Sequence, residues 1–217
     1  MKQNRTLSIG GTIVLVTSAY SAWKYATLPD QMPMHFNSRG EVDRYGSKLE
    51  AVLFCPIIMI VLLAIFVVIP KMLPEGKKID PFQKAWDTVV ITMMGFMACV
   101  QFMVLNPGLL GTGQGQVKFM MAAMSILFII LGNLMGKTER NYVMGIRTPW
   151  TLEDDEVWHR THHLGGRLMV GAGLLCLVLA LLGVNVLLIT GVILFSAFYP
   201  VWYSYALYRK LHPGSKA

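Results

Sequence analysis

The chain has 217 residues, of which 54% are hydrophobic and only 14% are charged, and its formal net charge is +7. Soluble domains carry about 25% charged residues, so this composition excludes an ordinary soluble domain. The apolar runs are long and nearly free of charge, as is typical of membrane-spanning helices. In a membrane protein, basic residues usually record topology, so we expect the lipid bilayer as a partner and no direct contact with nucleic acid.

Six apolar segments predict six transmembrane helices, because each approaches the roughly 20 residues needed to cross the hydrocarbon layer. They are Leu7–Leu28, Ala51–Met72, Trp86–Asn106, Val117–Met135, Leu168–Gly183 and Val186–Leu207. The first has a basic start like a signal peptide, but its apolar stretch continues to Leu28, so we interpret it as an uncleaved helix. We therefore expect an all-α integral membrane protein. A two-helix N-terminal segment would occupy residues 1–84, and a four-helix domain residues 85–217.

The distribution of lysine and arginine predicts the membrane face of each loop. Of the 19 basic residues, only five fall in the predicted outer loops, and the remaining 14 lie on the other side. The outer five are Lys24, Arg39, Arg44, Lys48 and Lys118. We therefore expect cytoplasmic N- and C-termini, a long cytoplasmic loop at residues 136–167 and a polar external loop at Pro29–Lys48.

The cytoplasmic loop holds the stretch GIRTPWTLEDDEVWHRTHHLGGR, which concentrates polar side chains in an otherwise apolar chain. Thr151 opens a Thr-x-x-Asp pattern that can cap a helix. The acids at 153–156 would fill the first helical turn, where the helix dipole favours negative charge. The glycines at 165–166 can end a helix. These signals predict a short helix from Leu152 to Leu164.

The segment before this helix, NYVMGIRTPW, indicates a shaped loop, because Thr148-Pro149 forces an extended or turning backbone. Arg147 can pair with the acids Asp154, Asp155 and Glu156 or with an acid of a partner, and both alternatives remain open. Trp150 and Trp158 can anchor the loop at the membrane surface or contribute to an interface. We expect Arg147 and these two tryptophans to matter most, because arginine grips carboxylates at two points and tryptophan gives rigid contact area.

Two alternatives come from other functional classes. A metal-dependent membrane enzyme would use Glu156, His159 and His163, which share one face of the predicted helix. The metalloprotease pattern requires a glutamate directly after the first histidine, and His159 lacks it, so we expect no metal, no cofactor and no catalytic residues. A small-solute transporter would need a polar path, for which Gln101 and Asn133 are thin evidence. We interpret both as hydrogen-bond partners between helices.

From the end of the fourth span onward, the sequence resembles the SdpI family of bacterial membrane proteins. The resemblance rests on a Gly-Asn pair, an Asn, the run Gly-Ile-Arg-Thr-Pro-Trp-Thr-Leu, an acidic pair and Val-Trp. The matching positions are Gly132, Asn133, Asn141, Gly145, Ile146, Arg147, Thr148, Pro149, Trp150, Thr151, Leu152, Asp155, Glu156, Val157 and Trp158. The stretch LPDQMPMHFNSRGEVDRYGSK and its flanking spans resemble the uncharacterised domain that often precedes this motif. The pair His162-His163 is not part of the family pattern, which leaves a task other than immunity open.

The resemblance implies a six-helix protein of the bacterial cytoplasmic membrane that confers immunity against a secreted toxic peptide. It also implies a small cytoplasmic repressor that is held at the membrane when the toxin is present. We therefore expect the external loop to meet the peptide, through candidate contacts at His35, Asn37, Asp43 and Tyr45. The inner loop Lys137–Arg167 would carry the signal or stabilise the fold, with its signature residues as the candidate partner-binding site.

Overall fold

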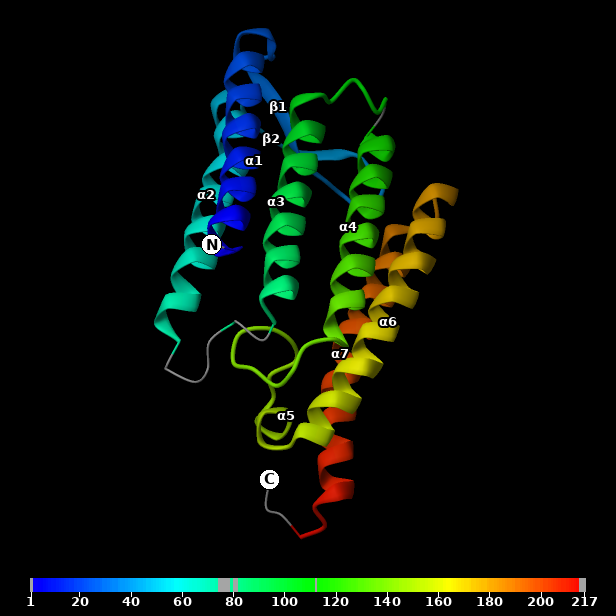
Figure 1. Ribbon diagram of the computed structural model, residues 1–217. Helices are drawn as coiled ribbons and strands as arrows, with labels where there is room; N and C mark the ends of the chain where they lie inside the picture. Colours follow the sequence, from blue (N-terminus) through cyan, green and yellow to red (C-terminus); the bar gives the residue numbers. More distant parts are fainter. Residues whose placement is uncertain (1, 74–78, 80–81, 112, 215–217) are drawn as a thin grey trace.

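The computed structural model describes residues 2–73, 79, 82–111 and 113–214. Helices and one β-hairpin follow each other along the chain (Figure 1). The elements are α1 Lys2–Lys24, β1 Gln31–Phe36, β2 Val42–Ser47, α2 Lys48–Met72, α3 Gln83–Leu105, α4 Gly113–Met135, α5 Pro149–Glu153, α6 Asp155–Leu182 and α7 Val186–Leu211. Lys77, Lys78 and Lys216, which contribute to the predicted orientation, lie outside the described residues.

Five helices, α2, α3, α4, α6 and α7, are long and apolar enough to cross a membrane. They coincide with five of the six predicted spans, which confirms a helical, multi-pass membrane protein. The predicted first span forms the 23-residue helix α1, which is not one of the five. Its buried positions include Thr6, Thr17 and Ser21, so this helix is less apolar than the others. A sixth crossing by α1 stays a prediction.

The helices pack in two groups, α1 with α2 and α3, and α4 with α6 and α7. A buried glutamine joins the first group, because Gln101 Nε2 of α3 donates hydrogen bonds at 2.9 Å to Ser21 Oγ of α1 and at 3.1 Å to the Ala51 carbonyl oxygen of α2. This geometry confirms the interpretation of Gln101 as an interhelical partner. The division between residues 84 and 85 remains a prediction.

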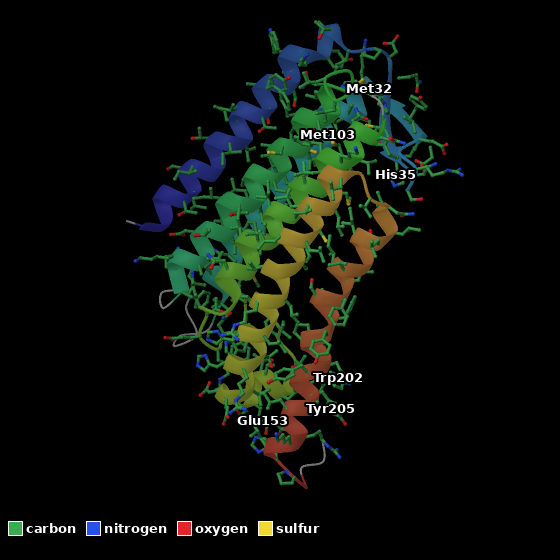
Figure 2. The ribbon with its side chains drawn as sticks, turned by 90° about the vertical axis from the view of Figure 1, so that its right-hand side faces the viewer. Met32, His35, Met103, Glu153, Trp202 and Tyr205 are labelled. Atoms are coloured by element: carbon green, nitrogen blue, oxygen red, sulfur yellow. The ribbon has the colours of Figure 1, made fainter. Side chains whose placement is uncertain are left out.

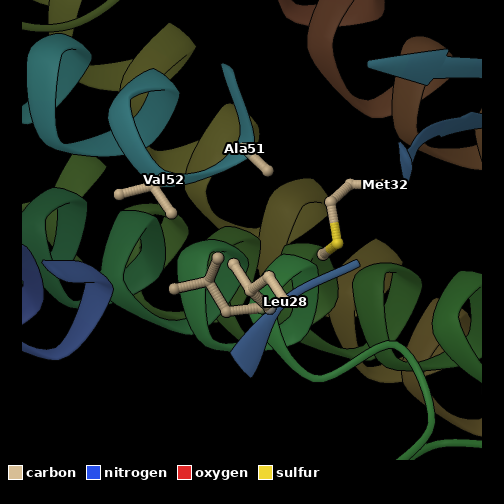
Figure 3. Packing of buried hydrophobic residues seen from close by; sticks show 5 residues of the cluster. Leu28, Met32, Ala51 and Val52 are labelled. Carbon is tan, nitrogen blue, oxygen red and sulfur yellow. The ribbon is translucent and has the colours of Figure 1, made fainter. Parts of the chain in front are cut away.

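A β-hairpin occupies the region where a polar loop was predicted. Strands β1 and β2 pair antiparallel. Met32 of β1 is fully buried against Leu28, Ala51 and Val52, whereas Gln31 beside it is exposed (Figure 3). The large apolar residues Met32, Met34 and Phe36 occupy every second position of QMPMHF, the period that a half-buried strand requires. The hairpin is therefore held down by an apolar face that packs on α2 and α3.

The hairpin and the loop around α5 lie at opposite ends of the helical bundle. Met32 and His35 mark one end, and Glu153, Trp202 and Tyr205 mark the other (Figure 2). The chain passes between these ends along α2, α3, α4, α6 and α7 (Figure 1). A membrane crossed by the bundle would therefore have the hairpin on one face and the α5 loop on the other.

Helix α6 differs from its prediction, because it runs unbroken from Asp155 to Leu182. The predicted helix end at Gly165-Gly166 was wrong. A Cβ atom at Gly166 would lie 2.7 Å from the carbonyl oxygen of Gly132 on α4, and one at Gly132 would lie 2.7 Å from Cβ of Met169. Small residues let the backbones of membrane helices approach closely. These glycines therefore form a helix-packing surface.

Candidate functional site

The inner loop Lys137–Arg167, called the signature loop from here on, contains a buried asparagine, Asn141, that shapes its backbone. Asn141 Oδ1 accepts the backbone N–H groups of Val143 at 2.9 Å and Met144 at 2.7 Å, and its Nδ2 donates to the carbonyl oxygen of Glu139 at 2.8 Å. This is an Asx-type turn, in which the side chain takes the place of a backbone partner. Asn141 therefore has a structural role.

Gly145 and His162 form the next fixed point of the loop. Gly145 has φ +104°, a region that favours glycine, and a Cβ atom there would overlap the imidazole of His162. His162 Nε2 accepts the backbone N–H of Ile146 at 2.9 Å, and its Nδ1 lies 2.8 Å from the carbonyl oxygen of Trp158. Because Nε2 accepts a hydrogen bond, Nδ1 carries the single hydrogen of the neutral ring and donates a hydrogen bond to the Trp158 carbonyl oxygen.

The neutral state of His162 follows from its surroundings. The residue lies outside the predicted span Leu168–Gly183, yet only 1% of it is exposed. The pKa of His162 is lowered from 6.5 to about 4, mainly by burial; the hydrogen bond to the Trp158 carbonyl oxygen raises it, and the nearby His159 adds to the lowering. The imidazole is therefore uncharged at neutral pH. It connects the loop to α6 by accepting a hydrogen bond from Ile146 and donating one to the Trp158 carbonyl oxygen.

Trp158 belongs to the interior of this loop. Its side chain is fully buried, its Nε1 donates to the carbonyl oxygen of Thr138 at 2.9 Å, and its ring stacks on His162 with 3.8 Å between centroids. Both predicted roles at a surface, as a membrane anchor and as an interface contact, were therefore wrong for this residue. Its burial joins the start of the loop to the first turns of α6.

Two helix caps replace the single predicted one. Thr148 and Thr151 form a reciprocal capping box for α5, with Pro149 at the first helical position. Asp154 then caps α6 by accepting the Val157 N–H at 2.9 Å. The prediction that Thr151 starts a helix from Leu152 was therefore wrong. The chain forms a short helix and turns at Asp154 before α6 begins.

Trp150 connects this corner to the last helix. Its indole Nε1 donates to Ser204 Oγ of α7, and its ring meets Tyr205 edge-on with centroids 5.3 Å apart. Ser204 is also 3.3 Å from Thr148 Oγ1. Tyr205 lies at the same end of the bundle as Glu153 (Figure 2). Trp150 is therefore half-buried and holds α5 against α7.

Three of the four acids at 153–156 have a partner other than Arg147. Asp155 pairs with Arg140 at 2.8 Å and Glu156 with Arg160 at 2.6 Å. Asp154 lies 2.9 Å from His212 Nε2 at the end of α7. The Val157 N–H, and to a smaller extent His212, hold the pKa of the Asp154 carboxyl below its usual value despite some burial.

Arg147 is exposed, and its Nη1 donates to the carbonyl oxygen of Tyr142 at 2.6 Å. Within the described parts of the chain it forms no ion pair. The predicted pairing with Asp154, Asp155 or Glu156 is therefore not what the structure contains. The second alternative, an acidic group supplied by a partner, stays open.

The candidates predicted for the external loop lie on the hairpin. His35 of β1 lies 2.6 Å from Asp43 of β2. Asn37 shapes the tip by accepting the backbone N–H groups of Arg39 at 2.9 Å and Glu41 at 3.0 Å. Tyr45 is 59% exposed, so it is free to contact another molecule.

Under β1 lies a groove of about 340 Å³ between the hairpin and helices α2, α3 and α4. Its wall includes the apolar side chains Met34, Phe36, Phe54, Met103 and Met120, with His35 and Arg44 at its border. Methionine side chains are flexible and adapt to differently shaped apolar partners. The groove can therefore accept an apolar segment of a peptide.

The alternative sites find little support. Among the described residues, no group of three His, Cys, Asp or Glu side chains lies close enough to hold a metal ion. His159 and His163 are exposed, and Glu156 is engaged with Arg160. Asn133 is exposed, and its Oδ1 accepts a hydrogen bond at 3.3 Å from Nζ of Lys137, which follows closely in the sequence. Its interpretation as an interhelical partner was therefore wrong.

Sequence reasoning missed His162, Ser204 and His212. His162 belongs to a helical series of buried residues, Val157, Trp158, Thr161, His162 and Gly165. Their spacing of three and four residues marks one buried helix face and was a usable signal. Ser204 and His212 lie far along the chain, and their contacts with the loop have no local signal.

Residues 137–204 match the SdpI/YfhL protein family, and residues 12–60 match a domain of unknown function, DUF1648. The chain is 25% identical over 210 residues to the immunity protein SdpI of Bacillus subtilis (strain 168), an alignment that covers 94% of this chain and 96% of that protein. No solved structure matches the chain. The resemblance predicted from the signature loop is thereby confirmed: the chain carries a DUF1648 domain followed by an SdpI/YfhL family segment, in a multi-pass protein of the bacterial cytoplasmic membrane.

Proposed function

We propose that this chain is a membrane immunity protein that protects its own cell against a secreted antimicrobial peptide. The observation that carries the proposal is the similarity to an immunity protein over nearly the full length of both chains. The packed signature loop adds support, because Asp154 caps α6, Asp155 and Glu156 form ion pairs, and His162 is a buried hydrogen-bond partner. These roles favour a binding protein over an enzyme.

The proposed topology places both termini and the signature loop in the cytoplasm, with α1 as a sixth crossing. The excess of basic residues on that side supports this orientation. The packing of α1 along α2 and α3 supports the sixth crossing, as does the way α1 leads into the hairpin end of the bundle (Figure 1). The hairpin would then face outward, where a secreted peptide arrives.

The hairpin side is the proposed receiving surface for the peptide. The groove under β1 offers flexible methionine walls for an apolar segment, and the exposed Tyr45 adds a rigid contact. The His35–Asp43 pair and the Asn37 turn hold the hairpin in shape beside this groove.

The inner loop is the proposed signalling surface. Buried or capping residues fix its backbone, and Arg147 projects from it exposed. A guanidinium held in this way can grip a carboxylate at two points, which suits an acidic residue on a small cytoplasmic repressor.

Deletion and complementation test the proposed immunity. The gene is deleted in its native host, and the cells are exposed to concentrated spent medium from the parental strain. We expect the deletion to reduce survival and the full chain, expressed in trans, to restore it. An empty vector and a membrane-level measurement of a C-terminally tagged chain are the controls. A deletion strain that survives as well as its parent would contradict immunity.

A further inference from the structure

A second groove, which the proposed function does not use, opens between α4 and α6 at the signature-loop end of the bundle. Its volume is about 450 Å³. The lining residues are Gly132, Asn133, Gly136, Lys137, His163, Gly166, Arg167, Val170, Gly171 and Leu174. The groove is shallow where glycines of α4 and α6 let the two helices approach each other. Its lining also contains two cationic side chains, Lys137 and Arg167, and no acid.

The two cations of this groove are not neutralised by the fold. Lys137 and Arg167 are both exposed, and neither forms an ion pair within the described ranges. Lys137 Nζ contacts only an uncharged amide oxygen of Asn133 at 3.3 Å. Arg140 and Arg160 of the same loop, by contrast, are paired with carboxylates. The groove therefore has an uncompensated positive charge.

The position of these residues along the helices matches the layers of a membrane. Lys137 follows the end of α4, and Arg167 directly precedes the predicted span Leu168–Gly183. One to two turns further into that span, Gly171 and Leu174 are exposed on the same groove. Cationic side chains at helix ends reach the headgroup layer, and apolar positions below them face acyl chains.

We propose that this groove binds one anionic phospholipid. The phosphate lies between Lys137 and Arg167, where the guanidinium can hold two of its oxygens. One acyl chain follows the wall formed by Gly171 and Leu174. Basic pockets between transmembrane helices bind anionic headgroups in this way. The proposal requires that the groove lies at a membrane surface. It holds for either face of the membrane.

Lipid binding to the purified full-length protein tests the charge requirement. The probes are phosphatidylglycerol and phosphatidylcholine, titrated in detergent and measured by native mass spectrometry. The variant Lys137→Gln/Arg167→Gln should lose about thirtyfold in affinity for phosphatidylglycerol, since each basic residue near a membrane surface contributes about fivefold. The matched control Arg209→Gln/Lys210→Gln removes the same two residue types from the exposed end of α7. Equal losses in both variants would overturn the proposal.

A steric variant separates a lipid from free phosphate and does not depend on charge. A Cβ atom at Gly171 meets nothing within 4 Å, so Gly171→Leu fills the groove without a clash. Gly191→Leu on α7 is the control, because its position is equally open. We expect Gly171→Leu alone to weaken phosphatidylglycerol binding, with unchanged thermal unfolding in detergent. Unchanged lipid binding in Gly171→Leu, or competition by millimolar inorganic phosphate, would overturn the lipid assignment.

Discussion

Gly145 and His162 lie so close together that a single methyl group at the glycine would overlap the imidazole ring. The same imidazole accepts the backbone N–H of the next residue, Ile146, at 2.9 Å. The positive φ of Gly145 turns the backbone so that this N–H points at Nε2. A glycine of the signature loop and a histidine outside the signature thus form one structural unit.

Gly145→Ala should destabilise the protein strongly, because it adds both backbone strain and a steric clash. A non-glycine residue at such φ values costs about 1–3 kcal/mol before any clash is counted. We expect the midpoint of thermal unfolding in detergent to fall by at least about 5 °C. Gly111→Ala is the matched control, because Gly111 has φ +75° and open space around it. If the midpoint of thermal unfolding falls by the same amount in both variants, the contact with His162 contributes nothing to stability.

His162 should make stability depend on pH. Its pKa in the folded protein is about 4, below the ordinary 6.5, so the unfolded chain binds more protons between these values. Stability is therefore complete above about pH 6.5 and is lost as the pH falls toward 4. Thermal unfolding measured from pH 7.5 to 4.5 should show a steeper decline for the wild type than for His162→Phe. The exposed His163→Phe is the control and should keep the wild-type slope.

Trp158→Phe should cost about 2 kcal/mol, because it opens space in a closed interior and leaves the Thr138 carbonyl oxygen without its donor. The matched substitution is Trp23→Phe, since Trp23 is 72% exposed and its change should be close to neutral. Denaturant titration followed by tryptophan fluorescence measures both. Equal stability of the two variants would show that the burial of Trp158 does not matter.

Asp154 should contribute through its cap and through His212. Asp154→Ala loses the hydrogen bond to the Val157 N–H and should cost about 1 kcal/mol, whereas Asp154→Asn keeps a capping oxygen and should cost less. A double-mutant cycle with His212→Ala isolates the contact that ties α7 to this corner. Because the pKa of Asp154 is lowered, its contribution is present above the ordinary value of 3.8 and is lost as the pH falls through the folded value.

Local signals in the sequence were sufficient for the transmembrane helices. Hydropathy is a property of each segment, and five of the predicted spans coincide with helices apolar enough to cross a membrane. The position of the signature loop, with an extended backbone at Thr148 before Pro149, also followed from local residues. The hairpin had a usable signal in the alternation of QMPMHF, but Met32 is recognised as buried only when Leu28 and Val52 are placed beside it.

Two of the remaining errors concern residues whose roles depend on partners far along the chain. Gly165-Gly166 looked like a helix end, but Gly166 packs against Gly132, and Gly165 lies against side chains of Met135, Ile146 and Pro200. Trp158 was expected at the membrane surface or in an interface, yet it is buried against the Thr138 carbonyl oxygen and His162. Gly132 and Thr138 could not be deduced as partners from the local sequence, whereas the spacing of Trp158 and His162 was a usable signal.

Arg147 is the exposed signature residue on which the proposed inner surface depends. Lysine at this position keeps the charge but loses the planar fork that grips a carboxylate. Because the side chain is exposed and its contact is with the Tyr142 carbonyl oxygen, neither Arg147→Lys nor Arg147→Ala should reduce the amount of protein in the membrane. Arg160→Lys, on the exposed start of α6, is the matched control.

Survival under peptide challenge, divided by the amount of protein in the membrane, is the measurement that decides whether Arg147 binds a partner. We predict that Arg147→Lys protects almost as poorly as Arg147→Ala, while Arg160→Lys protects like the wild type. Full protection by Arg147→Lys would contradict a role in gripping a partner and would leave the residue as a topological charge. Disappearance of both Arg147 variants from the membrane would contradict the partner-binding role as well, since the residue would then be a structural part of the loop.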